Sequence, residues 1–262
     1  MAFHKQVQKL YREHSQQGGF RNASPVAVFI DDDLFNEMAA DSRYSHHLCY
    51  TLGKELGQMG TPYELFIMDD FSLVDPGKYR MALFASCCHW KDEQLKALEN
   101  WKKDGRMLVF TGTVDAFAAS GIETLRLPGL EEEDGMRLPK LRFDTRPGDV
   151  ILATAEEGGT VEMLRRAPEF SVYAATAITL SSDKLRRLVA AAGGQVYNFQ
   201  GDAVYASEKY VGIHAAEAGI RRLCFNRMVQ LVDVFTGEEL PGCQCHVDIK
   251  MDFGETRLLE IR

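Results

Sequence analysis

Apolar runs and helical patterns alternate in the first half of the chain, and this alternation constrains the fold more than any other feature. Residues 26–30 read VAVFI and are followed by Asp31, Asp32 and Asp33, as in a strand buried on both faces. Further apolar runs at 63–68, 81–85 and 107–110 are separated by helical spacing at 45–58 and 92–103. The pattern predicts βαβ units, and therefore a parallel sheet with helices on both faces.

The pattern weakens between residues 112 and 158, where glycines, prolines and an acidic run at 131–134 interrupt it. Short strands are expected at 137–143 and 150–153. Regular patterning returns at 170–180, and a helix from Ser182 to about Ala192 is followed by expected strands at 195–199 and 202–206. The sequence thus predicts one predominantly parallel α/β domain over residues 25–206.

The two ends of the chain have different patterns. Residues 3–16 have helical spacing and lead into a linker that extends to residue 24. Residues 207–262 contain short β-rich stretches at 222–225, 229–235, 246–253 and 256–261, with a turn expected at 236–239. We expect an antiparallel module here that is too small to bury a core alone.

Composition excludes several partners. The 262 residues carry a formal net charge of -8, which argues against nucleic-acid binding. No apolar run reaches the roughly 18–20 residues of a membrane span, and the N-terminus lacks the layout of a signal peptide. The six cysteines show no pairing framework. We therefore expect reduced thiols in a cytoplasmic protein.

Several short motifs occur in an order that resembles one enzyme family. They are PVAVFID at 25–31, GTPYEL at 60–65, DEQL at 92–95, KDGRMLV at 103–109, LRRL at 185–188, AGGQVY at 192–197, HAAEAG at 214–219, VDVFTG at 232–237 and FGETR at 253–257. Their order resembles the trimerisation domain and C-terminal β module of family 42 β-galactosidase-like glycoside hydrolases. The resemblance covers roughly residues 20–262.

The resemblance implies a fold and a role. The fold would be flavodoxin-like, of the class I glutamine amidotransferase type, followed by the small β module. The hydrolytic carboxylates of the family lie in an upstream (β/α)₈ barrel, so this region would be a non-catalytic accessory and oligomerisation region, with a homotrimer as the expected assembly. No catalytic residue is predicted within it.

Candidate ligand-facing or partner-facing residues follow two of the expected strands. Asp31, Asp32 and Asp33 come after the first strand, and Cys87, Cys88, His89 and Trp90 come after the strand at 81–85. Ligands of open α/β sheets bind beyond the carboxyl ends of the strands. The acidic character of this edge suits neutral, hydroxyl-rich ligands or a protein surface.

Two alternative functions remain open on sequence alone. Cys87, Cys88 and His89 suit a small cysteine-dependent enzyme or redox protein, although the expected elbow, Thr111-Gly112-Thr113, has no cysteine. A sugar-binding module would use Trp90 or Trp101 as a stacking platform, although Trp101 shares a helical face with Leu98.

No cofactor or metal is predicted. Cys243, Cys245 and His246 lack the second ligand pair of a structural zinc site. Neither a G-x-G-x-x-G motif nor a Walker loop follows the first strand, so nucleotide binding is not expected.

Overall fold

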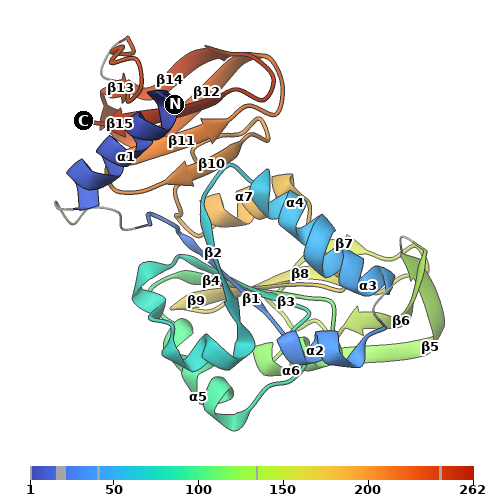
Figure 1. Ribbon diagram of the computed structural model, residues 1–262. Helices are drawn as coiled ribbons and strands as arrows, with labels where there is room; N and C mark the ends of the chain where they lie inside the picture. Colours follow the sequence, from blue (N-terminus) through green and yellow to red (C-terminus); the bar gives the residue numbers. More distant parts are fainter. Residues whose placement is uncertain (1, 16–21, 40–41, 134, 242–243) are drawn as a thin grey trace. The chain divides into compact units, whose positions relative to one another are not determined.

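The computed structural model describes residues 2–15, 22–39, 42–133, 135–241 and 244–262 (Figure 1). The chain divides into two compact units. Unit 1 comprises residues 1–25, 57–62 and 195–262, and unit 2 comprises residues 26–56 and 63–194.

Unit 2 is built on a nine-stranded sheet in the order β2-β1-β3-β4-β9-β8-β6-β5, with β7 paired to β8. The parallel strands are β1 (Val26–Ile30), β2 (Tyr63–Ile67), β3 (Met81–Ala85), β4 (Arg106–Thr111) and β9 (Phe170–Ala175). Residues 26–29 of β1 are wholly buried. The continuous apolar run therefore reflects a strand covered on both faces, as predicted.

Helices cover both faces of the parallel strands. Figure 1 shows α4 (Leu52–Gly57) and α7 (Ser182–Ala191) on one side, and α5 (Asp92–Trp101) and α6 (Val114–Ser120) on the other. Three short segments precede α4: α2 (Asp32–Glu37), α3 (Arg43–His46) and a π-helical turn (His47–Thr51). Two 3₁₀ turns, Met68–Leu73 and Pro76–Lys78, follow β2.

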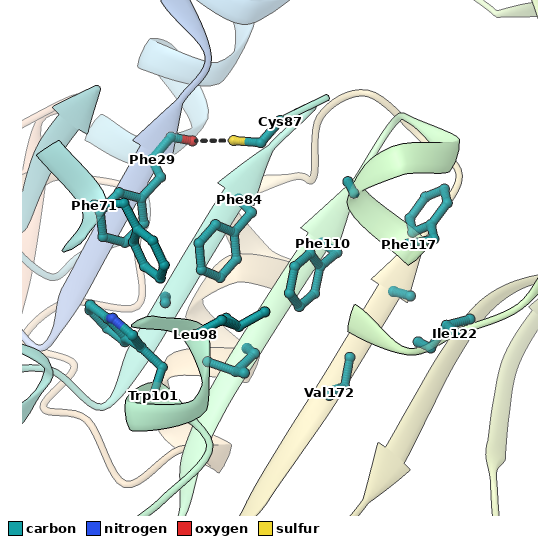
Figure 2. Close-up of a cluster of buried hydrophobic side chains, with 14 of the residues drawn as sticks. Phe29, Phe71, Phe84, Cys87, Leu98, Trp101, Phe110, Phe117, Ile122 and Val172 are labelled. Carbon is teal, nitrogen blue, oxygen red and sulfur yellow. Dashed lines mark hydrogen bonds between the residues drawn. The ribbon is translucent and has the colours of Figure 1, made fainter. Parts of the chain in front are cut away.

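An aromatic stack forms the core beneath α5. Phe84 of β3 stacks between Phe29 of β1 and Phe110 of β4, with ring centroids 5.2 and 4.7 Å apart (Figure 2). Trp101 of α5 meets Phe29 edge-on at 5.5 Å and is 1% exposed. Leu98 packs in the same cluster. Trp101 is therefore a core residue, as its helical spacing with Leu98 indicates.

The remaining strands of this sheet are antiparallel, so the sheet is mixed: the predicted parallel arrangement holds for the five strands above and not for these. They are β5 (Thr124–Glu133), β6 (Met136–Phe143), β7 (Val150–Thr154) and β8 (Thr160–Arg166). β5 joins β6, and β7 joins β8, through short glycine-containing turns, in which Gly135, Gly158 and Gly159 have positive φ angles. Short connections of this kind can link only antiparallel neighbours.

Unit 1 contains α1 (Ala2–Ser15) and two small antiparallel sheets. One has the order β10-β11-β15-β13, formed by Ala203–Ala206, Tyr210–His214, Thr256–Ile261 and Leu231–Asp233. The other pairs β12 (Gly219–Val229) with β14 (Gln244–Met251). A turn follows β13 as predicted, but the strands on either side of it belong to different sheets.

The strand predicted at residues 195–199 is absent; the segment is irregular, with residues 196–198 buried and Phe199 exposed. The Tyr197 and Asn198 amides both donate to the carbonyl of Gly60, at 2.9 and 3.1 Å. The Asn198 side chain donates to Asp202 Oδ2 at 3.0 Å. Loop contacts, rather than a strand ladder, thus satisfy these buried polar groups.

Candidate functional site

Three strand ends meet at one edge of the unit 2 sheet. Ile30 of β1 pairs with Ala85 of β3, which pairs with Thr111 of β4. Because the strands are parallel and in register, their following loops emerge together. Asp31 follows β1 directly, and residues 86–90 follow β3, so the sequence-predicted candidates occupy one edge.

The Asp31 carboxylate joins the two loops. Its side chain is 2% exposed. Oδ2 accepts hydrogen bonds from the backbone N–H groups of Cys88 (2.9 Å) and His89 (2.8 Å), and lies 2.9 Å from His89 Nδ1. Oδ1 accepts from the Leu34 amide at 3.3 Å, which caps α2. One buried carboxylate thus anchors both loops.

Burial and the nearby charges shift the pKa values of Asp31 and His89 in opposite directions. Burial raises the pKa of Asp31, but the hydrogen bonds from His89 and Cys88 lower it more, so the net pKa is below its ordinary value. Burial lowers the pKa of His89, but its bond to Asp31 and the nearby Glu37 and Asp33 carboxylates raise it overall. His89 Nε2 lies 3.3 Å from Glu37 Oε1.

The two neighbouring thiols differ in environment. Cys87 is fully buried, and its Sγ donates to the Phe29 carbonyl at 3.4 Å (Figure 2). Burial raises its pKa well above the ordinary value. Cys88 is partly exposed, and burial together with the Asp31 carboxylate raises its pKa to about 12. Neither environment favours the thiolate that a cysteine nucleophile requires.

The other candidates lie outside this cluster. Trp90 is partly buried, with its ring 5.2 Å from Phe84, and its Nε1 donates to the Cys87 carbonyl at 3.0 Å. Asp32 and Asp33 lie in the first turn of α2, where carboxylates favour the helix N-terminus, and Asp33 is exposed. The packing of Trp90 against the core leaves little of its ring for stacking.

One sharp backbone turn at this edge lies where the sequence does not indicate it. Ser86, directly after β3, has φ of 55°, a region that non-glycine residues rarely adopt. Its hydroxyl is buried and, among the described residues, has no hydrogen-bond partner. Gly112, at the expected elbow after β4, has φ of 86° and no room for a Cβ, which would lie 2.2 Å from Ser86 Oγ. Nothing in the sequence around Ser86 signals this conformation.

Within the described residues, one group has the ligand types and proximity to hold a metal ion: Asp31, Cys88 and His89. Asp31 and Cys88 are 57 positions apart, so no local spacing motif could reveal them as a set. Cys245 Sγ lies 4.0 Å from His246 Nδ1 at an exposed place on strand β14, and Cys243 lies outside the described residues. In the described part of the chain, no helix combines the length and apolar character that crossing a membrane requires.

Comparison with protein-family models and with curated protein sequences finds no match. Solved structures do match. A β-galactosidase from Bacillus circulans sp. alkalophilus has a TM-score of 0.64 and 17% identity, covering 93% of this chain and 42% of that chain. A catalytic mutant of a GH42 β-galactosidase from G. stearothermophilus has a TM-score of 0.60 and 16% identity, and the match covers 91% of this chain and 40% of that chain. An α-L-fucosidase isoenzyme from Paenibacillus thiaminolyticus has a TM-score of 0.60 and 10% identity, and the match covers 97% of this chain and 51% of that chain.

At these identities the likeness shows a shared fold. The chain spans about two fifths of the length of the two β-galactosidases.

Proposed function

We propose that this chain is an accessory and oligomerisation region, without catalytic activity of its own, of the kind found in β-galactosidase-like glycoside hydrolases. One observation carries the proposal: 93% of the chain matches the fold of a β-galactosidase but only 42% of that enzyme's length. The order of the sequence motifs supports the same family. The chain would then act in carbohydrate metabolism, alongside a (β/α)₈ catalytic domain.

The strand order supports the flavodoxin-like, amidotransferase-like part of the proposal. The parallel strands lie in the order β2-β1-β3-β4-β9. Counted among themselves, they have the order 2-1-3-4-5 that is typical of flavodoxin-like sheets. The strand β9 takes the fifth place because the antiparallel strands β5 to β8 are inserted before it in the sequence.

The raised pKa values of Cys87 and Cys88 support a role without cysteine catalysis. A nucleophilic thiol normally has a lowered pKa and a neighbouring base. Here the nearest charged partner of Cys88 is the Asp31 carboxylate, which disfavours the thiolate.

The edge strand β5 supports self-association. It ends the sheet order, and it exposes Leu125, Leu127 and Leu130. Arg126, Pro128 and the glutamates at 131–133 interrupt this strand and disfavour pairing of its backbone with another chain. The three exposed leucines instead offer an apolar surface that a second copy of the chain can cover. We propose a homo-oligomer in which this strand is covered, with a trimer as the expected number by family resemblance.

Hydrolysis of nitrophenyl galactosides by the purified chain tests the proposal. We expect no turnover above the uncatalysed rate, while an intact β-galactosidase assayed in parallel is active. Reproducible hydrolysis with kcat near about 1 s⁻¹ or above, in the usual range for enzymes, would contradict a non-catalytic role.

A further inference from the structure

The loops after β1 and β3 diverge at the point where the direction of strand addition reverses. From β1 the chain continues to β2 on one side of the sheet, and from β3 it continues to β4 on the other. The two loops therefore leave the same edge in opposite directions. In open parallel sheets the crevice at such a switch point is where small ligands bind. Asp31 and the Cys88-His89 pair lie there.

We propose that Asp31, Cys88 and His89 form a binding site for one divalent transition-metal ion of the zinc class. One ligand atom from each residue lies within 4.8 Å of the other two. A tetrahedral ion with bonds of about 2.0–2.3 Å holds its ligands roughly 3.3–3.8 Å apart. The widest spacing must therefore contract by up to about 1 Å, and the 2.9 Å between His89 Nδ1 and Asp31 Oδ2 must open slightly. Movement of the partly exposed Cys88 and His89 side chains can supply both changes.

The ligand set selects the class of metal. A thiolate and an imidazole favour zinc and its neighbours in the first transition row over magnesium or calcium, which prefer oxygen ligands. Asp31 is buried, whereas the His89 side chain is 35% exposed. The site thus has a fixed carboxylate at its base and two ligands at its mouth, which leaves an entry path and a coordination position for water.

The Asp31 carboxylate also pre-organises the other two ligands. It accepts hydrogen bonds from the backbone amides of both Cys88 and His89, so the loop that carries them is held before any ion arrives. Metal sites gain affinity when the supporting structure orients the ligands in advance.

The proton balance of binding follows from the same contacts. The Cys88 thiol loses its proton to solvent as the metal–sulfur bond forms. The ion takes the place of the proton between His89 Nδ1 and Asp31 Oδ2, which are now 2.9 Å apart. A doubly protonated ring releases that proton to solvent, and a neutral ring transfers it to Nε2. The neutral ring then carries its proton on Nε2, 3.3 Å from Glu37 Oε1. A carboxylate on the far ring nitrogen is the usual outer partner of a metal-bound histidine.

Cobalt titration of the full chain tests the site. Co²⁺ bound through sulfur gives a thiolate-to-cobalt charge-transfer band in the near ultraviolet, and we expect one equivalent per chain, displaced by Zn²⁺. Cys88→Ala and Cys88→Ser should both abolish the band, because the transition requires sulfur. His89→Ala should weaken Zn²⁺ binding by about tenfold or more, as measured by calorimetry.

Two cysteines serve as controls, with circular dichroism confirming that each variant is folded. Cys245→Ala removes the exposed thiol beside His246, and Cys87→Ala removes the buried thiol one position from the site. Both variants should keep the band. Absence of the band in the unmodified chain, its survival in a folded Cys88 variant, or its loss in Cys245→Ala would each overturn the proposal.

Discussion

At the scale of single residues, the Asp31 carboxylate accepts hydrogen bonds from two amides that the sheet leaves unpaired. The residues after β3 cannot continue the ladder because Ser86 turns the backbone into the positive-φ region. The N–H groups of Cys88 and His89 therefore depend on Asp31. Asp33, two positions along, is exposed and makes no comparable contact with that loop among the bonds of the described residues.

Replacement of Asp31 by Ala should lower the free energy of unfolding by about 2–4 kcal/mol, because two amides lose a charged acceptor. Asp33→Ala should change it by less than about 0.5 kcal/mol. Urea denaturation with a chelator present measures both without any contribution from bound metal. Equal effects of the two substitutions would contradict the anchoring role of Asp31.

A second carboxylate, that of Asp149, makes the folding stability of the chain depend on pH. Arg165 makes two 2.8 Å bonds to Asp149, and the Arg146 amide makes a third. The Arg165 bonds lower the pKa of Asp149 below its ordinary 3.8. A depressed folded-state pKa contributes stability that is fully present above about pH 4 and is lost as pH falls through the folded value.

Asp149→Asn should therefore cost about 1.5–3 kcal/mol of unfolding free energy at pH 7, and the difference from the unmodified chain should shrink towards pH 3. Denaturation at both pH values measures this, with the exposed Asp144→Asn as the control. The same difference at pH 3 as at pH 7 would show that Asp149 does not stabilise the fold through its charge.

At the scale of elements, the sequence pattern predicts the buried strands and the helices between them well. Strands covered on both faces are continuous apolar runs, and β1, β3 and β4 all lie where such runs occur. The pattern fails at residues 195–199, where Val196 and Tyr197 are buried without pairing in a sheet. It also does not reveal the direction of β5 to β8, which depends on turn length.

The candidate site is only partly predictable for a similar reason. The rule that ligands bind at strand ends places Asp31 and residues 87–90 at one edge. Register between β1 and β3 decides which of these side chains meet, and register is a property of the folded sheet. Thus Asp31, Cys88 and His89 come together, whereas Trp90, which follows directly in sequence, packs against Phe84.

The loop between α4 and β2 contains a position, residue 60, that only glycine fits. Gly60 has φ of 73°, and a Cβ there would lie 1.8 Å from the Asn198 carbonyl oxygen. Gly60→Ala should therefore cost at least about 2 kcal/mol, from strain and displacement of the backbone. Gly53→Ala, in an exposed helical position with no atom near the new methyl group, should instead stabilise by about 0.5–1 kcal/mol. Thermal denaturation separates the two, and a neutral Gly60 variant would contradict this close approach.

At the scale of the whole molecule, self-association should depend on β5. We expect light scattering to give a mass above the 29.4 kDa of one chain at micromolar concentration. A specific contact should bury more than about 1,000 Å² in total. Leu125→Lys combined with Leu130→Lys should shift the chain to monomer, because both side chains are more than half exposed on this edge.

Leu73→Lys is the matched control, since Leu73 is 81% exposed but lies in the 3₁₀ turn after β2. It should leave the mass unchanged. A monomeric unmodified chain would contradict the proposed assembly, and an oligomer that survives the double substitution would place the interface elsewhere.

The division into two units has a consequence for how such a protein can change over time. The polypeptide passes between the units at residues 25/26, 56/57, 62/63 and 194/195. No single break in the gene therefore yields either unit whole. Recombination that replaces one unit with a foreign counterpart therefore needs several coordinated crossovers. The two units are thus expected to be inherited together as one block, with variation arising by substitution rather than by exchange of modules.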